Sequence, residues 1–287
     1  MRILFAVHGY PADIEDEAAL LVQISARALA GAGAVVCVAA GTNANDGGEA
    51  RSADLVPASD ARIEVVRLSR SDLHPEHWQK SQSASIPERF RRLIREFEPD
   101  VVHVHHWRRL SRDLVACAAA ERVPAVVSLH DLWSSCLLAT RKRPADGSNC
   151  DATFAPMPCL ACAGSVPPRT PFMPIDQLFL SFGSHRADLE RELKLARALL
   201  ASSAEQAERA AHFLADEMPA VRAVAHDNPA ALLATYERAI TAGPPAAPPD
   251  VDAWYAPRMR AFAEETWDRG LTDTPRSELG YETPSRE

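Results

Sequence analysis

The sequence predicts an α/β fold in which helices cover both faces of a parallel β-sheet. Short apolar runs that end in polar clusters alternate along the chain with stretches whose apolar residues recur at helical spacing. Strand-then-helix units, repeated in this order, imply right-handed crossovers and a doubly wound sheet. Strands are expected over residues 2–7, 34–40, 62–68, 100–105, 124–129 and 196–201, and helices over residues 15–31, 86–97, 110–121, 175–192, 204–214 and 228–241.

The first elements follow from their apolar patterns. Residues 2–7 form a continuous apolar run, typical of a buried parallel strand, and turn residues follow it. The helix over 15–31 has Asp13 as its expected N-cap. Its apolar face consists of Leu20, Leu21, Ile24, Ala28 and Leu29. Residues 34–40 are a second continuous apolar run, and a polar loop follows. Residues 62–68 alternate in part, which favours a more exposed or edge strand.

The helix over 86–97 carries apolar side chains on one side and arginines around the rest. One interpretation is a basic amphipathic surface that contacts an anionic membrane. The other is an ordinary crossover helix with its arginines in water, which needs only the apolar stripe that every such helix has. Farther along, Ser202 or Ser203 is the expected cap of the helix over 204–214, and Asn228 and Pro229 stand at the start of the helix over 228–241.

Composition restricts the class of protein. The chain has 287 residues, of which 47% are hydrophobic and 24% charged, enough to bury a sizeable core. Its formal net charge of -8 argues against a nucleic-acid partner. No segment approaches the ~20 uninterrupted apolar residues of a membrane span, and the N-terminus lacks the pattern of a signal peptide. We therefore expect a cytoplasmic globular protein without a transmembrane segment, for which peripheral membrane contact stays open.

The cysteines fall into two groups. Cys37 and Cys117 lie in apolar stretches, where a thiol commonly serves as a small buried hydrophobe. The others cluster in one irregular loop, residues 134–165: Cys136, Cys150, Cys159 and Cys162. In a cytosolic chain such a cluster favours a metal site over disulfides. A structural zinc is expected, because four thiolates can close a tetrahedral site. An iron–sulfur or redox centre and unliganded thiols are the alternatives.

Polar side chains follow three of the predicted strands, at the edge where open parallel sheets bind ligands. They are His8 and Tyr10, then His105, His106 and Arg109, then His130, Asp131 and Trp133. The second group can bind hydroxyls or phosphate, together with Arg108 and Arg112. Alternation along a strand sends His103 and His105 to one face, so at least one histidine of this run is expected in the core. A three-histidine metal site is disfavoured, because consecutive strand positions diverge.

Two segments resemble a known family. Residues 100–105, Asp-Val-Val-His-Val-His, and residues 124–136, which contain His-Asp-Leu-Trp and end at Cys136, are similar to the N-terminal acceptor domain of family 4 retaining glycosyltransferases. The resemblance covers residues 1 to about 214 and implies a Rossmann-like domain, one half of the GT-B fold. In this family the N-terminal domain binds the acceptor and a second domain holds a nucleotide-sugar donor. The resemblance therefore implies that this chain binds a sugar, glycan, glycolipid or small-molecule acceptor. The cysteine loop also has counterparts in part of this family.

The resemblance implies roles for the strand-end residues. His130 would point into the cleft between the two domains and contact the transferred sugar, with Asp131 beside it as a second catalytic residue. The alternative is that these two residues only cap a turn. The expected acceptor-binding residues are His8, Tyr10, His105, His106, Arg109 and Trp133.

The chain also departs from the family. Where members carry two glycines near the donor diphosphate, this sequence has Asp16 and Glu17, whose carboxylates would repel a diphosphate. After Leu214 there is no further β–α alternation of the length that a donor domain needs. We expect a remnant of the end of that domain, a proline-rich linker, a terminal helix and a disordered tail. These are residues 215–242, 243–251, 252–270 and 271–287.

Two functions stay open at this point. In one, the chain is the acceptor-binding half of a glycosyltransferase that works with a donor-binding half on a separate protein. In the other, it is a catalytically degenerate paralogue that acts as a metal-stabilised binding module. The isolated chain is expected to be inactive in both cases, because one half lacks the second wall of the cleft. A nicotinamide or nucleotide binder is disfavoured, because no Gly-x-Gly-x-x-Gly follows the first strand.

Overall fold

A computed structural model describes residues 1–245, apart from residues 15, 45, 58, 60, 73, 74, 81, 82, 84, 167–174, 215 and 216. The predicted terminal helix 252–270, the tail 271–287 and most of the linker 243–251 lie outside the described residues. Within the described part, no helix is both long and apolar enough to cross a membrane.

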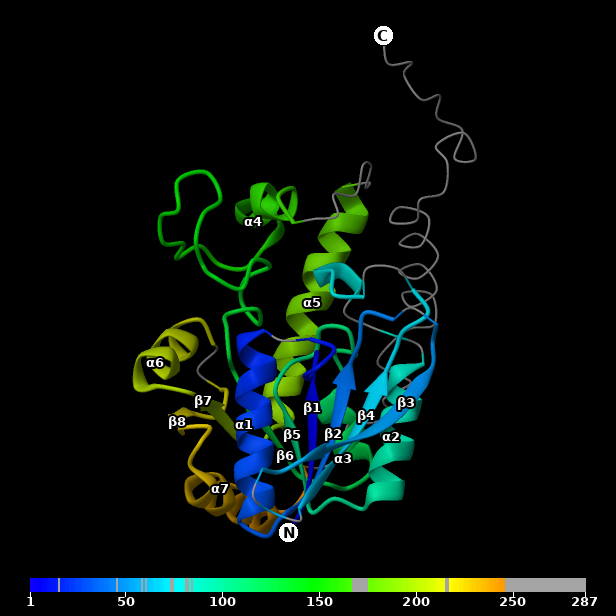
Figure 1. The fold of residues 1–287 in the computed structure, drawn as a ribbon. Helices are drawn as coiled ribbons and strands as arrows, with labels where there is room; N and C mark the ends of the chain where they lie inside the picture. The colour runs from blue at the N-terminus through cyan, green and yellow to red at the C-terminus, as the bar shows by residue number, and fades with distance from the viewer. Residues whose placement is uncertain are drawn as a thin grey trace.

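The described chain forms one mixed sheet with helices on both faces (Figure 1). The strands are β1 (Arg2–Val7), β2 (Val35–Gly41), β3 (Glu49–Leu55), β4 (Arg62–Leu68), β5 (Val101–Val104), β6 (Ala125–Ser128), β7 (Ala198–Ala201) and β8 (Val221–Ala223). The helices are α1 (Glu17–Gly31), α2 (Ile86–Phe97), α3 (Leu114–Ala120), α4 (Pro156–Ala163), α5 (Ile175–Leu195), α6 (Ala204–His212) and α7 (Pro229–Ala242), with a short 3-10 turn at Trp78–Lys80.

The strand order is β3-β4-β2-β1-β5-β6-β7-β8, and every neighbouring pair is parallel except β3 and β4. This confirms the predicted doubly wound α/β fold. One apolar core joins the sheet to α2, α3 and α5, and a second core joins its other face to α1 and α7. Strands β1, β2, β5 and β6 are buried almost throughout because helices cover both faces, which explains their continuous apolar sequences.

The edge of the sheet differs from the prediction. We expected a polar loop between β2 and β4, and β4 as an exposed or edge strand. Instead β3 pairs antiparallel with β4 and forms the edge, with nearly all of its residues exposed. Neither face of β3 packs into a core, so its sequence lacks the alternation of apolar and polar residues that predicts a strand: Glu-Ala-Arg-Ser-Ala-Asp-Leu.

The start of α1 also differs. Asp16, not Asp13, is the N-cap, and its Oδ1 accepts a hydrogen bond of 2.9 Å from the backbone N–H of Ala19. The predicted apolar face is rotated as well, since Leu20 and Ile24 are 44% and 46% exposed. Small residues and Val22 face the sheet in their place. The close approach of α1 to the sheet therefore uses alanines, which a count of large apolar residues overlooks.

Residues after 214 belong to the same sheet and core. Strand β8 pairs with β7, and α7 packs against α1 and the ends of β5 and β6. Tyr236 of α7 is fully buried, and its hydroxyl lies 2.7 Å from Nδ1 of His103. A domain boundary at residue 214 would divide this core, and the predicted domain limits stay predictions.

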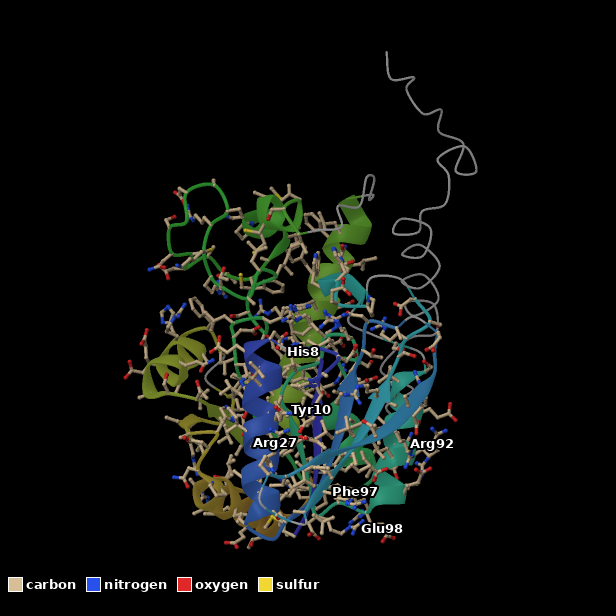
Figure 2. All side chains as sticks on the ribbon, in the orientation of Figure 1. His8, Tyr10, Arg27, Arg92, Phe97 and Glu98 are labelled. Carbon is tan, nitrogen blue, oxygen red and sulfur yellow. The ribbon has the colours of Figure 1, made fainter. Side chains whose placement is uncertain are left out.

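The arginines of α2 are engaged within the protein. Arg91 and Arg95 both pair with Glu121, and Arg92 pairs with Glu49 on β3. Arg89 donates to the backbone carbonyl oxygens of Gly48 and Ser69. Figure 2 shows Arg92 on the outer side of this helix. These contacts fit the crossover-helix interpretation, in which the arginines tie α2 to its neighbours.

Candidate functional site

The histidines gather where β1, β5 and β6 end side by side. The register pairs Ala6 with Val104 and Val104 with Val127, so the residues that follow these strands emerge at one edge of the sheet. We call this edge the mouth; it is formed by His8, His105, His106, His130, Asp131 and His226. Its histidines are buried or nearly so. The structure thus brings these predicted strand-end residues together, and it adds His226, which sequence reasoning missed.

The centre of the mouth is a pair of histidines. Nδ1 of His105 lies 2.9 Å from Nε2 of His130, a hydrogen bond that needs a proton on one of the two nitrogens. The opposite ring nitrogens, Nε2 of His105 and Nδ1 of His130, are buried without a hydrogen-bond partner among the described residues. Two neutral imidazoles joined in this way leave one open donor and one open acceptor, whichever tautomer holds. These two open nitrogens lie at opposite ends of the pair, so each can bond a different hydroxyl group.

Burial keeps His130 uncharged. Burial first, and the neighbouring His226 and His106 next, lower the pKa of His130 to about 3. Burial likewise lowers the pKa of His105, and the neighbouring imidazoles of His103, His130 and His226 lower it further. At neutral pH the pair consequently carries hydrogen bonds and no net charge.

His226 extends the cluster from the loop before α7. Its ring stacks on that of His130 with 4.8 Å between centroids and 26° between planes, and lies 5.8 Å from His105. Ser25 of α1 donates a 2.8 Å hydrogen bond to the backbone carbonyl of His226. A signal was present in the sequence: residues 221–227 end in His226-Asp227, as β6 is followed by His130-Asp131. Because residues 215–242 were expected to be a remnant of the donor domain, His226 was not grouped with the strand-end histidines.

Asp131 organises the turn after β6. Its Oδ1 accepts a 2.8 Å hydrogen bond from the backbone N–H of Trp133, and its Oδ2 lies 3.5 Å from Nε2 of His106 and 4.0 Å from the Arg108 guanidinium. Burial alone would raise the pKa of Asp131, but the contact with His106 and the Trp133 N–H hold it at about 2. Asp131 is therefore an anion at neutral pH.

Two further side chains fix the same turn. His185 of α5 lies with Nε2 3.1 Å from the Trp133 carbonyl oxygen, and Gln206 of α6 donates to the carbonyl oxygens of Leu129 and His130. The position of His130 thus depends on His185 of α5 and Gln206 of α6, which both follow it by more than fifty residues in the sequence.

His8, which Figure 2 shows beside α1, forms one side of the mouth together with Asp16, the N-cap of this helix. Nε2 of His8 lies 2.5 Å from Oδ2 of Asp16. The hydrogen bond from His8 lowers the pKa of Asp16, so Asp16 is ionised and His8 donates. The Nδ1 atom of His8 is then a buried acceptor without a partner among the described residues. The acidic side chain predicted to stand in the donor-phosphate position therefore lies at the mouth, held by a histidine.

Other predicted site residues lie differently. Tyr10 is fully buried, and its hydroxyl donates to Asp54 of β3 over 2.7 Å. Trp133 is buried beneath the mouth, with its ring 5.1 Å from that of His106. His103 is the expected core histidine: its ring nitrogens lie 2.7 and 2.8 Å from hydroxyls of Tyr236 and Ser128.

The arginines after β5 divide into two groups. Arg108 and Arg109 are half-buried at the mouth, and burial lowers the pKa of Arg109. Gly41 makes room for Arg109, because a Cβ at this position would lie 2.7 Å from Cβ of Arg109 and 2.8 Å from the carbonyl oxygen of His8. Arg112, by contrast, is buried against α5, where it pairs with Asp188 over 3.4 Å.

The four cysteines of the loop come together around α4, an element that the sequence did not predict. Cys159 and Cys162 lie one turn apart on this helix. Burial raises the pKa of Cys162, and the thiols of Cys136, Cys159 and Cys150 raise it further, as expected for neighbouring groups of like charge. In the described part of the chain, no three His, Cys, Asp or Glu side chains are arranged closely enough to hold a metal ion. Zinc binding would thus need these thiols to draw together.

We expect the protein to lose stability as the pH falls below neutrality. Burial lowers the pKa of His106 to about 4 and that of His130 to about 3, whereas an unfolded histidine titrates near about 6.5. Between these values the unfolded state binds more protons, so each histidine removes about 1.4 kcal/mol of unfolding free energy per pH unit. Denaturant unfolding at about pH 7, 6 and 5 measures the loss.

The matched variant for this measurement is His130→Asn, which keeps hydrogen-bonding groups but does not titrate. Its stability should fall less steeply with decreasing pH than that of the parent. Equal slopes for parent and variant would show that His130 is not held neutral by the fold.

Residues 20–161 match the sequence model of a family described as Glycosyltransferase Family 4. A solved structure that is similar to the chain is that of a UGT transferase from Siraitia grosvenorii in complex with UDP, with 15% sequence identity, a TM-score of 0.41, and coverage of 78% of this chain and 51% of that one. The chain thus spans about half the length of that protein, and a likeness at this level carries no argument about function. No curated protein sequence matches the chain significantly. The match of residues 20–161 and the doubly wound sheet support a family 4-like glycosyltransferase domain with the Rossmann-like architecture of one GT-B half.

Proposed function

We propose that the mouth binds the acceptor of a glycosyl transfer, and that the sugar comes from a nucleotide-sugar held by a separate donor-binding half. The observation that carries this proposal is the His105–His130 pair, with one donor and one acceptor that have no partner among the described residues. Leaving buried polar groups unpaired costs free energy, about 1–3 kcal/mol for each. A sugar carries several hydroxyl groups that can each donate or accept, so two of them would satisfy the two atoms at opposite ends of the pair.

The electrostatics define what His130 does in this proposal. An imidazole whose pKa lies near 3 is neutral at pH 7, so it orients a hydroxyl by hydrogen bonding and carries no proton to give as an imidazolium. Asp131, an anion beside His106, holds the turn that presents His130. Its carboxylate also supplies negative charge close to the reacting groups, which favours the positive charge that develops on a transferred sugar.

The donor is assigned to a separate half for an electrostatic reason. The N-terminus of a helix usually attracts phosphate through its free N–H groups and its dipole. At α1 this position is already taken by the ionised carboxylate of Asp16, which caps the helix and is bound to His8. A diphosphate would meet a negative charge there. Asp16 is also the observation that favours the second candidate function, a binding module that holds the acceptor without transfer.

We further propose that the cysteine cluster holds a structural zinc. Cys136 and Cys150 lie near enough to Cys159 and Cys162 to help raise the pKa of these two thiols, and thiolates are the ligands that zinc prefers. The cluster lies in the loop of residues 134–165, which begins directly after the turn at His130, so the metal would fix this loop next to the mouth. Zinc would supply cross-linking and no chemistry at the mouth.

The acceptor proposal predicts that His130→Phe weakens binding of alkyl glycosides by roughly tenfold, because the ring keeps its stacking but loses both hydrogen bonds. Octyl glucoside, octyl mannoside and octyl galactoside serve as probes below their micelle-forming concentrations, and calorimetric titration measures binding. Tyr10→Phe is the control, since the Tyr10 hydroxyl is bonded to Asp54. Equal binding by His130→Phe and the parent would contradict the assignment.

Transfer separates the two candidate functions. The chain is assayed with uridine-, guanosine- and thymidine-linked sugars, first alone and then with separately produced donor-binding domains. Activity that appears only in the mixture selects the two-part enzyme. Acceptor binding without transfer in any mixture selects the binding module.

The zinc proposal predicts close to one zinc per chain in protein purified without chelators, with binding that weakens at low pH because the thiols must lose protons. Elemental analysis measures the metal content. Cys159→Ser should lose the zinc, whereas Cys37→Ser, at a buried thiol outside the cluster, should keep it. A parent protein without zinc or iron would rule the proposal out.

A further inference from the structure

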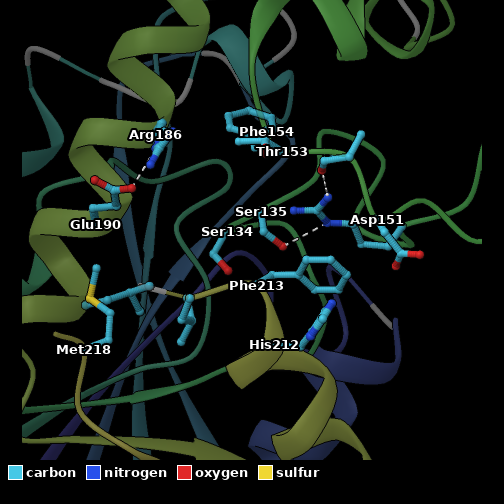
Figure 3. Close-up of a pocket in the computed structure, with 14 residues that line it drawn as sticks. Ser134, Ser135, Asp151, Thr153, Phe154, Arg186, Glu190, His212, Phe213 and Met218 are labelled. Carbon is cyan, nitrogen blue, oxygen red and sulfur yellow. Dashed lines mark hydrogen bonds and ion pairs between the residues drawn. The ribbon is translucent and has the colours of Figure 1, made fainter. Parts of the chain in front are cut away.

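A cleft outside the mouth lies between the cysteine-rich loop, α5 and the end of α6 (Figure 3). Its volume is about 280 Å³, near the lower end of the range for small-molecule sites. The turn that carries His130 continues into Ser134 and Ser135, which form part of its wall. Asp151, Thr153 and His212 at its rim are exposed, so the cleft is open to solvent.

An aromatic ring with a fixed position lies in this cleft. The guanidinium of Arg141 packs over the ring of Phe213 at 3.8 Å from its centroid. Arg141 is 6% exposed, and it donates to the Ser135 hydroxyl over 3.3 Å and to the Ala152 carbonyl over 2.5 Å. Because the Arg141 guanidinium is buried and held by two hydrogen bonds, it restricts rotation of the Phe213 ring beneath it. Phe213 is therefore a rigid platform, half-buried in the protein and in contact with the cleft.

The remaining lining combines apolar surface with balanced charge. Leu193, Leu214 and Met218 supply apolar contacts. Arg186 and Glu190 form an ion pair of 2.7 Å on α5, and Figure 3 shows both at the cleft, across from Phe213. The paired charges, with the hydroxyl of Ser134, offer donors and acceptors in similar number.

This chemistry selects the class of ligand. An anion would find both guanidinium groups already engaged, Arg141 with oxygens of the loop and Arg186 with Glu190. A purely apolar ligand would desolvate the polar rim without compensation. A neutral sugar ring has an apolar C–H face for an aromatic platform and hydroxyls for polar side chains, so it matches both parts of the lining.

We propose that this cleft is a carbohydrate-binding site for one or two neutral sugar rings, with a ring face on Phe213 and hydroxyls on Glu190, Arg186 and Ser134. The site goes beyond the acceptor mouth, since binding here needs neither His130 nor a donor. A transferase with such a site would bind a sugar ring of the saccharide other than the one that carries the reacting hydroxyl.

The test is saccharide binding by the full chain, with maltose, cellobiose and mannobiose as neutral probes and glucuronate as the charged one. Saturation-transfer NMR and calorimetric titration measure the affinity. At least one neutral disaccharide should bind saturably and more tightly than glucuronate. Phe213→Ala should weaken that binding by about tenfold, and Phe213→Tyr should retain it.

Two further variants secure the interpretation. Glu190→Ala combined with Arg186→Ala removes side chains at the surface of α5 and tests the site even where Phe213→Ala impairs folding. Arg62→Ala, an exposed arginine outside the cleft, should bind the disaccharide as the parent does. Loss of binding in His130→Phe would move the saccharide to the mouth. Absence of binding at ~10 mM disaccharide, or binding unchanged in Phe213→Ala and in the α5 double variant, would overturn the proposal.

Discussion

The burial of several imidazoles at one edge of the sheet is the constraint on which the rest of the site depends. Parallel strands β1, β5 and β6 end side by side, so the residues that follow them share one small space. Burial disfavours the charged form of every histidine in that space, and each imidazole lowers the pKa of its neighbours further. The result is a neutral cluster beside two carboxylates, Asp16 and Asp131, that stay ionised. Such a surface suits hydroxyl groups better than phosphates.

The cluster is held in place from outside the strands. His185 on α5 and Gln206 on α6 fix the turn that carries His130, while Tyr236 on α7 binds His103 below it. The side-chain oxygens of the buried Glu192 carboxyl group accept hydrogen bonds from the indole N–H of Trp107 and the backbone N–H groups of Val115 and Ala116, which anchors α5 to the start of α3. Helices α5, α6 and α7, from the second half of the chain, thus set the geometry of the histidines in its first half. Changes in α5, α6 or α7 should reach the mouth through these bonds.

The sequence was sufficient for the main strands and for placing His105 and His130 at strand ends, because continuous apolar runs define buried strands and parallel strands end at one edge. It was not sufficient where tertiary packing determines whether a strand forms or which helix face is buried. Strand β3 has no apolar pattern because neither face is covered, and α1 turns alanines toward the sheet where the larger Leu20 and Ile24 were expected. Tyr10 follows β1 as a mouth residue would, yet its hydroxyl reaches Asp54, a partner that exists only once β3 has formed. His226 depends in the same way on β8 joining the sheet.

The central claim is that His105 and His130 form a neutral, hydrogen-bonded pair that offers one donor and one acceptor, at its opposite ends, to hydroxyl groups of a sugar. NMR of the imidazole ring nitrogens in isotope-labelled protein tests it directly, because protonated, donor and acceptor nitrogens have distinct shifts. The account predicts that both rings are neutral from about pH 7 down to pH 5, each with a single N–H, and that an alkyl glycoside shifts Nε2 of His105 and Nδ1 of His130 together. Rings that titrate near pH 6.5 as free histidine does, or that keep their shifts when the glycoside binds, would contradict it.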